Sequence, residues 1–195
     1  MNVEGNYYDK HGSSNPIVKK LMKKFHHVLN EFVQKSHAKT VLDVGCGEGH
    51  TTKTVKDANK VLIEGMELGE EMVKKAQSLH PDIHFEQGSI YEINRKDASY
   101  DLVLSSEVLE HLDEPRKGLM ELKRISKRYV LVSVPNEPLW RIANMLRGSY
   151  LKKLGNTPGH VNHWSKKQLY NFLKPHFSKV FVRKVVLWNI AICIK

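Results

Sequence analysis

Residues 41–50 read VLDVGCGEGH and place three glycines within five positions, directly after a short run of strand-forming residues. Glycine weakens the interior of a strand or helix, so such a cluster marks a turn with positive φ or a place where a ligand lies against the main chain. The turn also precedes a helix predicted over 50–58, whose N-terminal N–H groups favour an anionic or strongly polar group. The glycine turn therefore predicts a ligand-binding site.

The rest of the chain alternates between strand and helix patterns. Apolar residues at helical spacing after Asn15-Pro16 predict a first helix over 16–35. Further helices are predicted at 50–58, 70–79, 114–126 and 165–173, and strands at 41–44, 60–68, 82–88, 99–106, 128–135, 180–187 and 189–195. This alternation indicates an α/β fold with a largely parallel sheet, which binds ligands at the carboxyl ends of its strands.

Composition narrows the class of protein. A chain of 195 residues with 41% apolar and 27% charged residues suits one globular domain. It has no apolar run of membrane-spanning length, no secretory signal, and two cysteines without a disulfide or metal-ligand pattern, so we expect it in the cytoplasm. The formal net charge of +10 favours an anionic partner such as nucleic acid, a membrane surface or a phosphorylated substrate, or serves solubility alone.

Two familiar nucleotide-binding motifs do not fit the glycine turn. A P-loop needs a lysine and a Ser or Thr after its last glycine, whereas Gly49 is followed by His50-Thr51-Thr52. The dinucleotide motif Gly-x-Gly-x-x-Gly differs in spacing from Gly45-x-Gly47-x-Gly49. The turn therefore favours a ligand other than a pyrophosphate.

Four sequence blocks occur in order between residues 38 and 135: VLDVGCGEG at 41–49, GME at 65–67 followed by GEEM at 69–72, YDLVLSSEVLEHL at 100–112, and RYVLVSVP at 128–135. Together they resemble the class I S-adenosylmethionine-dependent methyltransferases, in particular the type 11 branch. The resemblance implies a single-domain, Rossmann-like α/β fold with a seven-stranded, mostly parallel sheet whose last strand is antiparallel. It also implies S-adenosyl-L-methionine as the cofactor.

The resemblance assigns a set of cofactor-binding residues. The glycine backbone would pass under the methionine part of the cofactor, and Glu67 would accept hydrogen bonds from the ribose hydroxyls, a role that suits a bidentate carboxylate. Ser89 stands where relatives often carry an acid for the adenine amino group, and Ile90 would pack on the ring. The full set is Asp43, Gly45, Cys46, Gly47, Glu67, Leu68, Ser89, Ile90, Ser106 and Glu107. The alternatives are that Asp43 only braces the turn and that Glu67 is a solvated acid at a strand end.

Two histidines are candidate proton acceptors. Methyl transfer is an in-line displacement from an activated sulfonium, so positioning supplies much of the acceleration and a general base is optional. His111, after the 99–106 strand, is the first candidate and His163 the second, with a packing role as the alternative for His111. His160-x-x-His163 invites a metal hypothesis, but we expect no metal because no third ligand is nearby in sequence and Ser165 with Gln168 forms a capping box.

The expected organisation is one methyltransferase domain: an N-terminal lid and helix at 1–36, a cofactor-binding core at 38–135, an acceptor-covering insertion at 136–164 and a C-terminal helix and strand pair at 165–195. We expect the insertion, with Tyr7-Tyr8, to form a cover whose aromatic and basic residues suit an acceptor with an apolar body and a polar or anionic head. The predicted function is methyl transfer to a small-molecule or lipid-like acceptor, with peripheral membrane contact. The alternatives are a nucleic-acid or protein methyltransferase and a non-catalytic cofactor-binding module.

Overall fold

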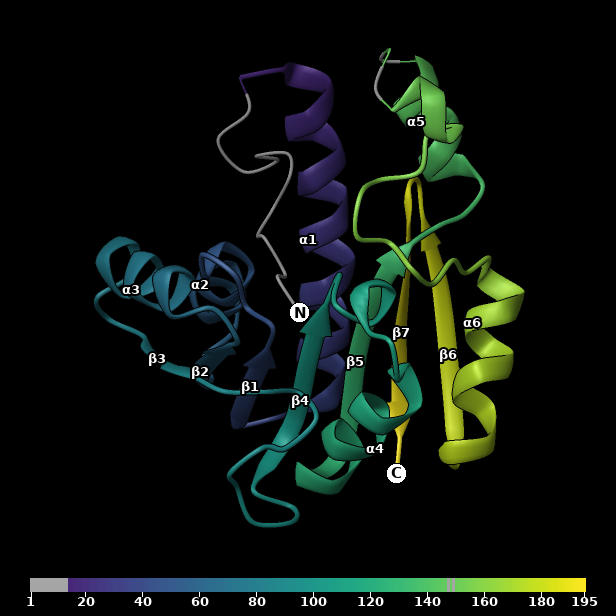
Figure 1. The fold of residues 1–195 in the computed structure, drawn as a ribbon. Helices are drawn as coiled ribbons and strands as arrows, with labels where there is room; N and C mark the ends of the chain where they lie inside the picture. The colour runs from purple at the N-terminus through teal and green to yellow at the C-terminus, as the bar shows by residue number, and fades with distance from the viewer. Residues whose placement is uncertain (1–13, 147, 149) are drawn as a thin grey trace.

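The computed structural model describes residues 14–146, 148 and 150–195. Seven strands form one sheet in the order β3-β2-β1-β4-β5-β7-β6 (Figure 1). The strands are β1 (Thr40–Val44), β2 (Leu62–Glu67), β3 (His84–Gln87), β4 (Tyr100–Ser106), β5 (Ser126–Pro135), β6 (Lys179–Val185) and β7 (Trp188–Ile194). Strands β1 to β5 pair in parallel, and β7 is antiparallel to both of its neighbours, β5 and β6. The predicted fold class is confirmed, with the antiparallel strand inserted between β5 and β6.

Six α-helices and three short 3₁₀ segments connect these strands within the described residues. The α-helices are α1 (Pro16–Ser36), α2 (His50–Ala58), α3 (Glu70–Leu79), α4 (Pro115–Ile125), α5 (Leu139–Leu146) and α6 (Lys166–Leu173). The 3₁₀ segments are η1 (Leu109–His111), η2 (Leu151–Lys153) and η3 (Lys174–His176). No helix in the described ranges has the length and apolar character needed to cross a membrane.

The predicted helix boundaries rest on caps that the structure contains. The Asn15 side chain accepts a hydrogen bond from Ile17 N, and Pro16 occupies the first helical position of α1. Ser165 and Gln168 form the predicted capping box at the start of α6. Each of these helices therefore begins where the sequence predicts.

Helices cover both faces of the sheet, each over its own apolar cluster. One face buries Phe25, Leu29 and Phe32 of α1 and Val55 of α2 against strand residues such as Leu104. On the other face α4 and α6 pack on the sheet through a list of fully buried side chains: Leu119, Leu122, Ile125, Leu169 and Leu173. Figure 1 shows α1 behind the sheet and α4 and α6 in front of it. Both sheet faces are thus buried, which leaves the strand ends as the place for ligands.

Candidate active site

The candidate site lies where the strand order reverses. The chain runs outward from β1 through β2 to β3 and then returns to β4, on the other side of β1. The turn after β1, residues 45–49, and the segment after β4, residues 107–111, therefore meet at the carboxyl edge of the sheet. Open α/β sheets bind their ligands at such a switch point.

The glycines of the turn are required by backbone geometry and by close approach. Gly45, Gly47 and Gly49 have φ values of 76°, 55° and 78°, which L side chains rarely adopt. A Cβ on Gly45 would collide with the side chain of Val108, so the two segments touch here. A Cβ on Gly47 would meet nothing within 4 Å. The backbone at Gly47 therefore faces open space, as a ligand-binding turn requires.

Glu67, at the end of β2, reaches across to this turn. Its Oε2 accepts a hydrogen bond of 2.8 Å from Gly47 N, and its Oε1 accepts one of 2.7 Å from Leu68 N. The side chain is half-buried, and Leu68 is 46% exposed. The backbone amides of residues 45 and 46 donate to Met66 O, at 2.7 and 3.1 Å, and thereby tie the turn to the end of β2. Glu67 is thus placed at the glycine turn, as its predicted role requires.

Asp43 lies beneath the turn and is fully buried. Its Oδ2 accepts a 2.7 Å hydrogen bond from the Thr52 hydroxyl of α2. Burial, with a smaller contribution from the Glu67 carboxylate, raises the pKa of Asp43 to about 7 against the opposing hydrogen bond from Thr52. In the structure Asp43 is therefore bonded to α2 through Thr52, whereas the alternative considered for it was that it braces the glycine turn. Its predicted contact with the cofactor stays a prediction.

The predicted adenine side of the site is less open. Ser89 Oγ accepts a hydrogen bond of 3.2 Å from Tyr91 N, and Ile90 is 9% exposed and packs within the core under α4. The Cys46 side chain packs beside Phe85, and burial raises the pKa of its thiol. Ile90 therefore contributes to the core, and the structure leaves little of it for the predicted ring contact.

The segment after β4 carries the predicted pair Ser106 and Glu107. Ser106 Oγ lies 2.9 Å from Ser133 Oγ at the end of β5. Glu107 has a φ of 58°, and its Oε1 accepts a 2.9 Å hydrogen bond from Trp188 Nε1. Burial of His26 in α1 lowers its pKa to about 4, and the nearby Glu107 carboxylate offsets only part of this lowering. His26 is thus neutral near pH 7 and forms a part of this region that the sequence did not reveal.

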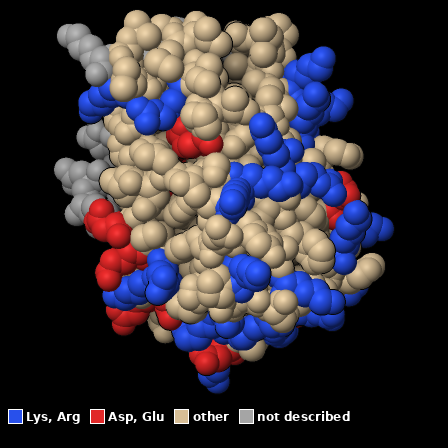
Figure 2. Space-filling view, turned by 90° about the vertical axis from the view of Figure 1, so that its right-hand side faces the viewer, with Lys and Arg blue, Asp and Glu red and all other residues tan. Residues whose placement is uncertain are grey.

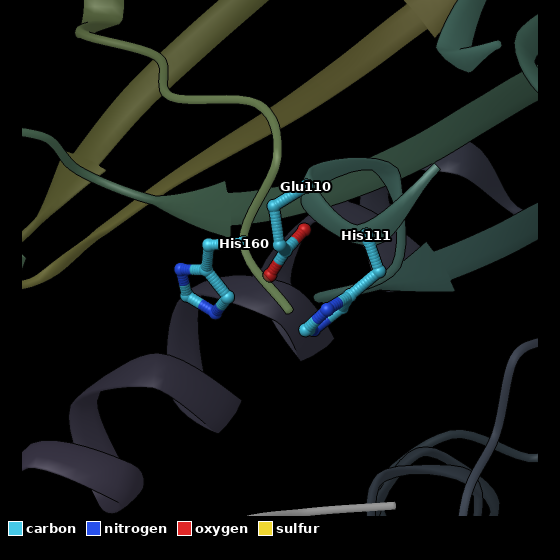
Figure 3. Close-up of side chains that lie close together, drawn as sticks. All are labelled: Glu110, His111 and His160. Carbon is cyan, nitrogen blue, oxygen red and sulfur yellow. The ribbon is translucent and has the colours of Figure 1, made fainter. Parts of the chain in front are cut away.

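His111 belongs to a cluster with Glu110 and His160. Ligand-type atoms of the three side chains all lie within 4.8 Å of one another. Glu110 and His160 are buried and His111 is half-buried. The imidazole centroids of His111 and His160 are 4.9 Å apart at an angle of 79°. Figure 3 shows the Glu110 carboxylate between the two rings, with the side chains coming from η1 and from the loop after η2.

His163, the second catalytic candidate, lies elsewhere. Its Nδ1 is 3.7 Å from Glu137 Oε1, and its side chain is 35% exposed. Burial raises the pKa of Glu137. The neighbouring His163 acts in the opposite direction and offsets only part of this increase. The structure therefore separates the two predicted proton acceptors, and it places His160, not His163, beside His111.

The predicted acceptor cover is only partly as expected. Trp140 of α5 stacks on His160 at a centroid distance of 6.4 Å and meets Trp188 edge-on at 5.7 Å. Trp164, however, is 9% exposed and packs on Phe172 in the core. Tyr7-Tyr8 lie outside the described residues.

Two apolar side chains of α5 are exposed on the surface. Ile142 is 43% and Leu146 is 84% exposed, whereas the polar Asn144 is buried and donates to Gly155 O at 2.8 Å. Beyond the helix, Leu151 and Leu154 are also exposed. Polar side chains thus attach α5 to the loop that follows it, and Ile142 and Leu146 remain on the surface.

Comparison with known proteins agrees with this geometry. Residues 42–132 match a family model described as a methyltransferase domain of the type 11 branch. These residues are therefore similar to the S-adenosylmethionine-dependent methyltransferases, as predicted, and relatives named as such support the predicted family, enzyme class and cofactor for the matched domain.

Curated relatives act on chemically different molecules. Norajmaline N-methyltransferase of Rauvolfia serpentina is 34% identical over 94 residues, which are 45% of this chain and 32% of that protein. Malonyl-[acyl-carrier protein] O-methyltransferase of Halalkalibacterium halodurans is 30% identical over 96 residues, which are 46% and 35% of the two chains. The chain thus spans about a third of the length of these relatives.

The fold also matches a solved methyltransferase with bound S-adenosylhomocysteine. Magnesium protoporphyrin IX methyltransferase of Synechocystis has a TM-score of 0.67 and 18% sequence identity, and the match covers 94% of this chain and 89% of that chain. At this identity the likeness concerns the fold alone.

Proposed function

We propose that this protein transfers the methyl group of S-adenosylmethionine to a small-molecule or lipid-like acceptor. The observation that carries the proposal is the Glu67 carboxylate, held by Gly47 N beside a turn whose backbone faces open space. A vicinal ribose diol needs a carboxylate at this place, and the cationic sulfonium favours a site with carboxylates nearby. Glu107, at the end of the neighbouring strand β4, supplies one.

The acceptor side supports an amphipathic substrate. Trp140 presents an aromatic ring beside His160 and Trp188, and α5 adds exposed Ile142 and Leu146. Basic residues lie in and directly after α5. Arg141 donates to Leu154 O, and Lys153 is exposed. An acceptor with an apolar body and a polar or anionic head would use both kinds of side chain.

The two thiols support a proposal for the cellular setting. Cys46 and Cys193 are both free cysteines. Burial raises the pKa of each thiol, which lowers its reactivity. Free thiols suit a reducing compartment, and we place the enzyme in the cytoplasm.

The test is release of S-adenosylhomocysteine by the purified chain in the presence of phenols, amines, acyl-thioester carboxylates and RNA. We expect turnover with a small or acyl-linked acceptor. Turnover confined to RNA, with strong salt dependence, would favour the nucleic-acid alternative. Cofactor binding without turnover across all acceptors would leave a binding module, and failure to bind either the cofactor or its product would refute the proposal.

A further inference from the structure

The loop containing His160 is fixed against η1 by backbone and side-chain hydrogen bonds. Val161 N and Asn162 N both donate to Glu110 O, at 2.9 and 3.0 Å. Asn162 Nδ2 also donates to Leu109 O at 3.2 Å and to Leu112 O at 2.6 Å. Residues 50 positions apart are thus held in one arrangement, and Glu110, His111 and His160 are positioned before any ligand binds. Pre-organisation of this kind is what a metal site requires of its ligands.

The tautomer of His111 is set by the same loop. His111 Nδ1 lies 3.0 Å from the Gly159 carbonyl oxygen. A carbonyl oxygen only accepts, so Nδ1 carries the proton and the lone pair of the ring lies on Nε2. A metal-binding histidine typically donates its other ring N–H to a carbonyl or a carboxylate, which fixes its orientation.

We propose that Glu110, His111 and His160 bind a divalent transition-metal ion, and that the ion coordinates an oxygen atom of the methyl acceptor. Two imidazoles and one carboxylate form a ligand set that Zn²⁺, Mn²⁺ and Fe²⁺ accept with coordination positions left for water or substrate. With metal–ligand bonds of about 2.0 to 2.1 Å in a tetrahedral site, neighbouring ligand atoms lie about 3.3 Å apart. The ligand atoms of the cluster lie within 4.8 Å of one another, so binding an ion requires them to approach by up to about 1.5 Å through side-chain rotation.

The cluster stands at the place where an acceptor must lie. Glu110 and His111 follow Val108, whose side chain packs against Gly45 of the cofactor turn. Trp140, stacked on His160, joins the cluster to the aromatic surface described for the acceptor. A metal ion lowers the pKa of a bound hydroxyl and orients it for an in-line displacement. The acceptor class this implies is a phenol, an alcohol or a carboxylate.

His160-x-x-His163 did not indicate a metal site, because no third ligand is close in sequence. The structure supplies two ligands from η1 and uses only His160 of that motif. The role assigned to the ion rests on the proposed methyl transfer, whereas binding of the ion does not and can be measured separately.

The test uses the full chain, stripped with EDTA and titrated with Co²⁺, whose visible d–d absorption reports coordination by imidazole and carboxylate. We expect one ion per chain, displaced by Zn²⁺. His160→Ala and Glu110→Gln should each weaken binding by at least about 100-fold, since even changes around the ligands of a metal site cost 10- to 100-fold. His163→Ala is the matched control, because it removes a histidine from the same loop and should leave binding unchanged.

Thermal unfolding by circular dichroism and calorimetric binding of S-adenosylmethionine show whether each variant is folded. Wild-type protein that binds the cofactor but not Co²⁺ overturns the metal site and leaves the proposed function intact. Co²⁺ binding that persists in both folded variants also overturns it. Protein that binds Co²⁺ as predicted but neither binds the cofactor nor releases S-adenosylhomocysteine would refute methyl transfer and keep the site.

Discussion

The Glu67 carboxylate is oriented before the cofactor binds, because backbone amides on both sides of it donate to its two oxygen atoms. Gly47 belongs to the turn after β1, and Leu68 to the turn after β2. A carboxylate held in this way loses little conformational freedom on binding a diol, so most of the hydrogen-bond energy appears as affinity.

We expect Glu67→Ala to weaken S-adenosylmethionine binding by about 1 to 3 kcal/mol, the usual contribution of hydrogen bonds to a charged group. Isothermal titration calorimetry measures the change. Glu70→Ala is a suitable control, because Glu70 is an acid three residues further on that pairs with Lys74 on the surface of α3. Equal affinity of the Glu67 variant and the wild type would show that the ribose lies elsewhere.

The raised pKa of the buried Asp43 carboxyl predicts that the free energy of unfolding depends on pH. Its pKa is about 7 in the fold against an ordinary value of 3.8, so its contribution to stability is fully present below pH 3.8 and is lost as the pH rises through about 7. The amide that Asp43→Asn introduces stays neutral and can still accept from Thr52. We expect the stability of this variant relative to wild type to increase from about pH 4 to pH 7, by up to about 1.4 kcal/mol per pH unit, and to level off above pH 7.

Chemical denaturation of both proteins at several pH values gives this difference directly. Comparison at each pH also removes the effect of His26, which has the opposite sign: its pKa is lowered to about 4, so its contribution is present above pH 6.5 and is lost as the pH falls through about 4. A difference between variant and wild type that does not change with pH would contradict the raised pKa of Asp43.

The helices and strands of the core could be predicted from the sequence, because local signals agree with the tertiary fold. Helix α2 occupies 50–58 and α3 occupies 70–79, as predicted. Near-continuous apolar runs identified the central strands, since both faces of the sheet are buried there. The Asn15 cap and the Ser165 capping box placed two helix starts for the same reason: each bond lies within three residues.

Only those parts of the site that lie within one short sequence motif could be predicted. The glycine turn and Glu67 are local motifs, and the structure brings them together. The cluster of Glu110, His111 and His160 depends on hydrogen bonds between segments about 50 residues apart, which periodicity and spacing do not reveal. The outward face of α5 was also not predictable, because an apolar stripe alone does not say whether a helix packs inward.

The position of Trp140 in α5 predicts that its removal weakens acceptor binding and leaves cofactor binding unchanged. Trp140 Nε1 donates to Thr157 Oγ1 at 3.0 Å, and its ring lies beside His160. We expect Trp140→Ala to raise the KM for the acceptor about 5- to 30-fold, from loss of about 1 to 2 kcal/mol of aromatic contact, with S-adenosylmethionine affinity unchanged. Trp140→Phe, which keeps a ring, should retain most of the activity.

Steady-state kinetics with saturating cofactor, together with calorimetry, separates these effects. The same experiment on His163→Ala examines the second catalytic candidate, whose position beside Glu137 predicts a smaller change. A matched loss of cofactor affinity in Trp140→Ala would indicate structural damage to the insertion, and unchanged acceptor kinetics would contradict a role for this surface.

Charge is distributed unevenly over the whole molecule. Figure 2 shows Lys and Arg side chains spread over the face that carries α6 and β6. A second basic group, Lys19, Lys20, Lys23 and Lys24, is exposed on α1. The first residues of α1 and the helix α5 both lie at the end of the molecule to which the carboxyl ends of the strands point (Figure 1). Exposed apolar residues, Ile17 and Leu146 among them, belong to these two helices.

This arrangement predicts peripheral adsorption to anionic membranes, with the candidate site turned toward the lipid. A basic residue near such a surface contributes about 1 kcal/mol, and the attraction decays within a Debye length. We expect the protein to sediment with vesicles containing phosphatidylserine at low salt, to dissociate as salt increases, and to bind weakly to neutral vesicles. Replacing the four α1 lysines by Glu should abolish sedimentation.

The control replaces Lys166, Lys167, Lys179 and Lys184, on the α6 and β6 face, by Glu. It changes the net charge by the same amount, so it distinguishes an oriented contact from a general effect of the +10 charge. Loss of binding in the α1 variant alone supports the oriented contact. Equal loss in both variants would mean that net charge alone drives adsorption, and vesicle binding that is independent of lipid charge would exclude an electrostatic contact altogether.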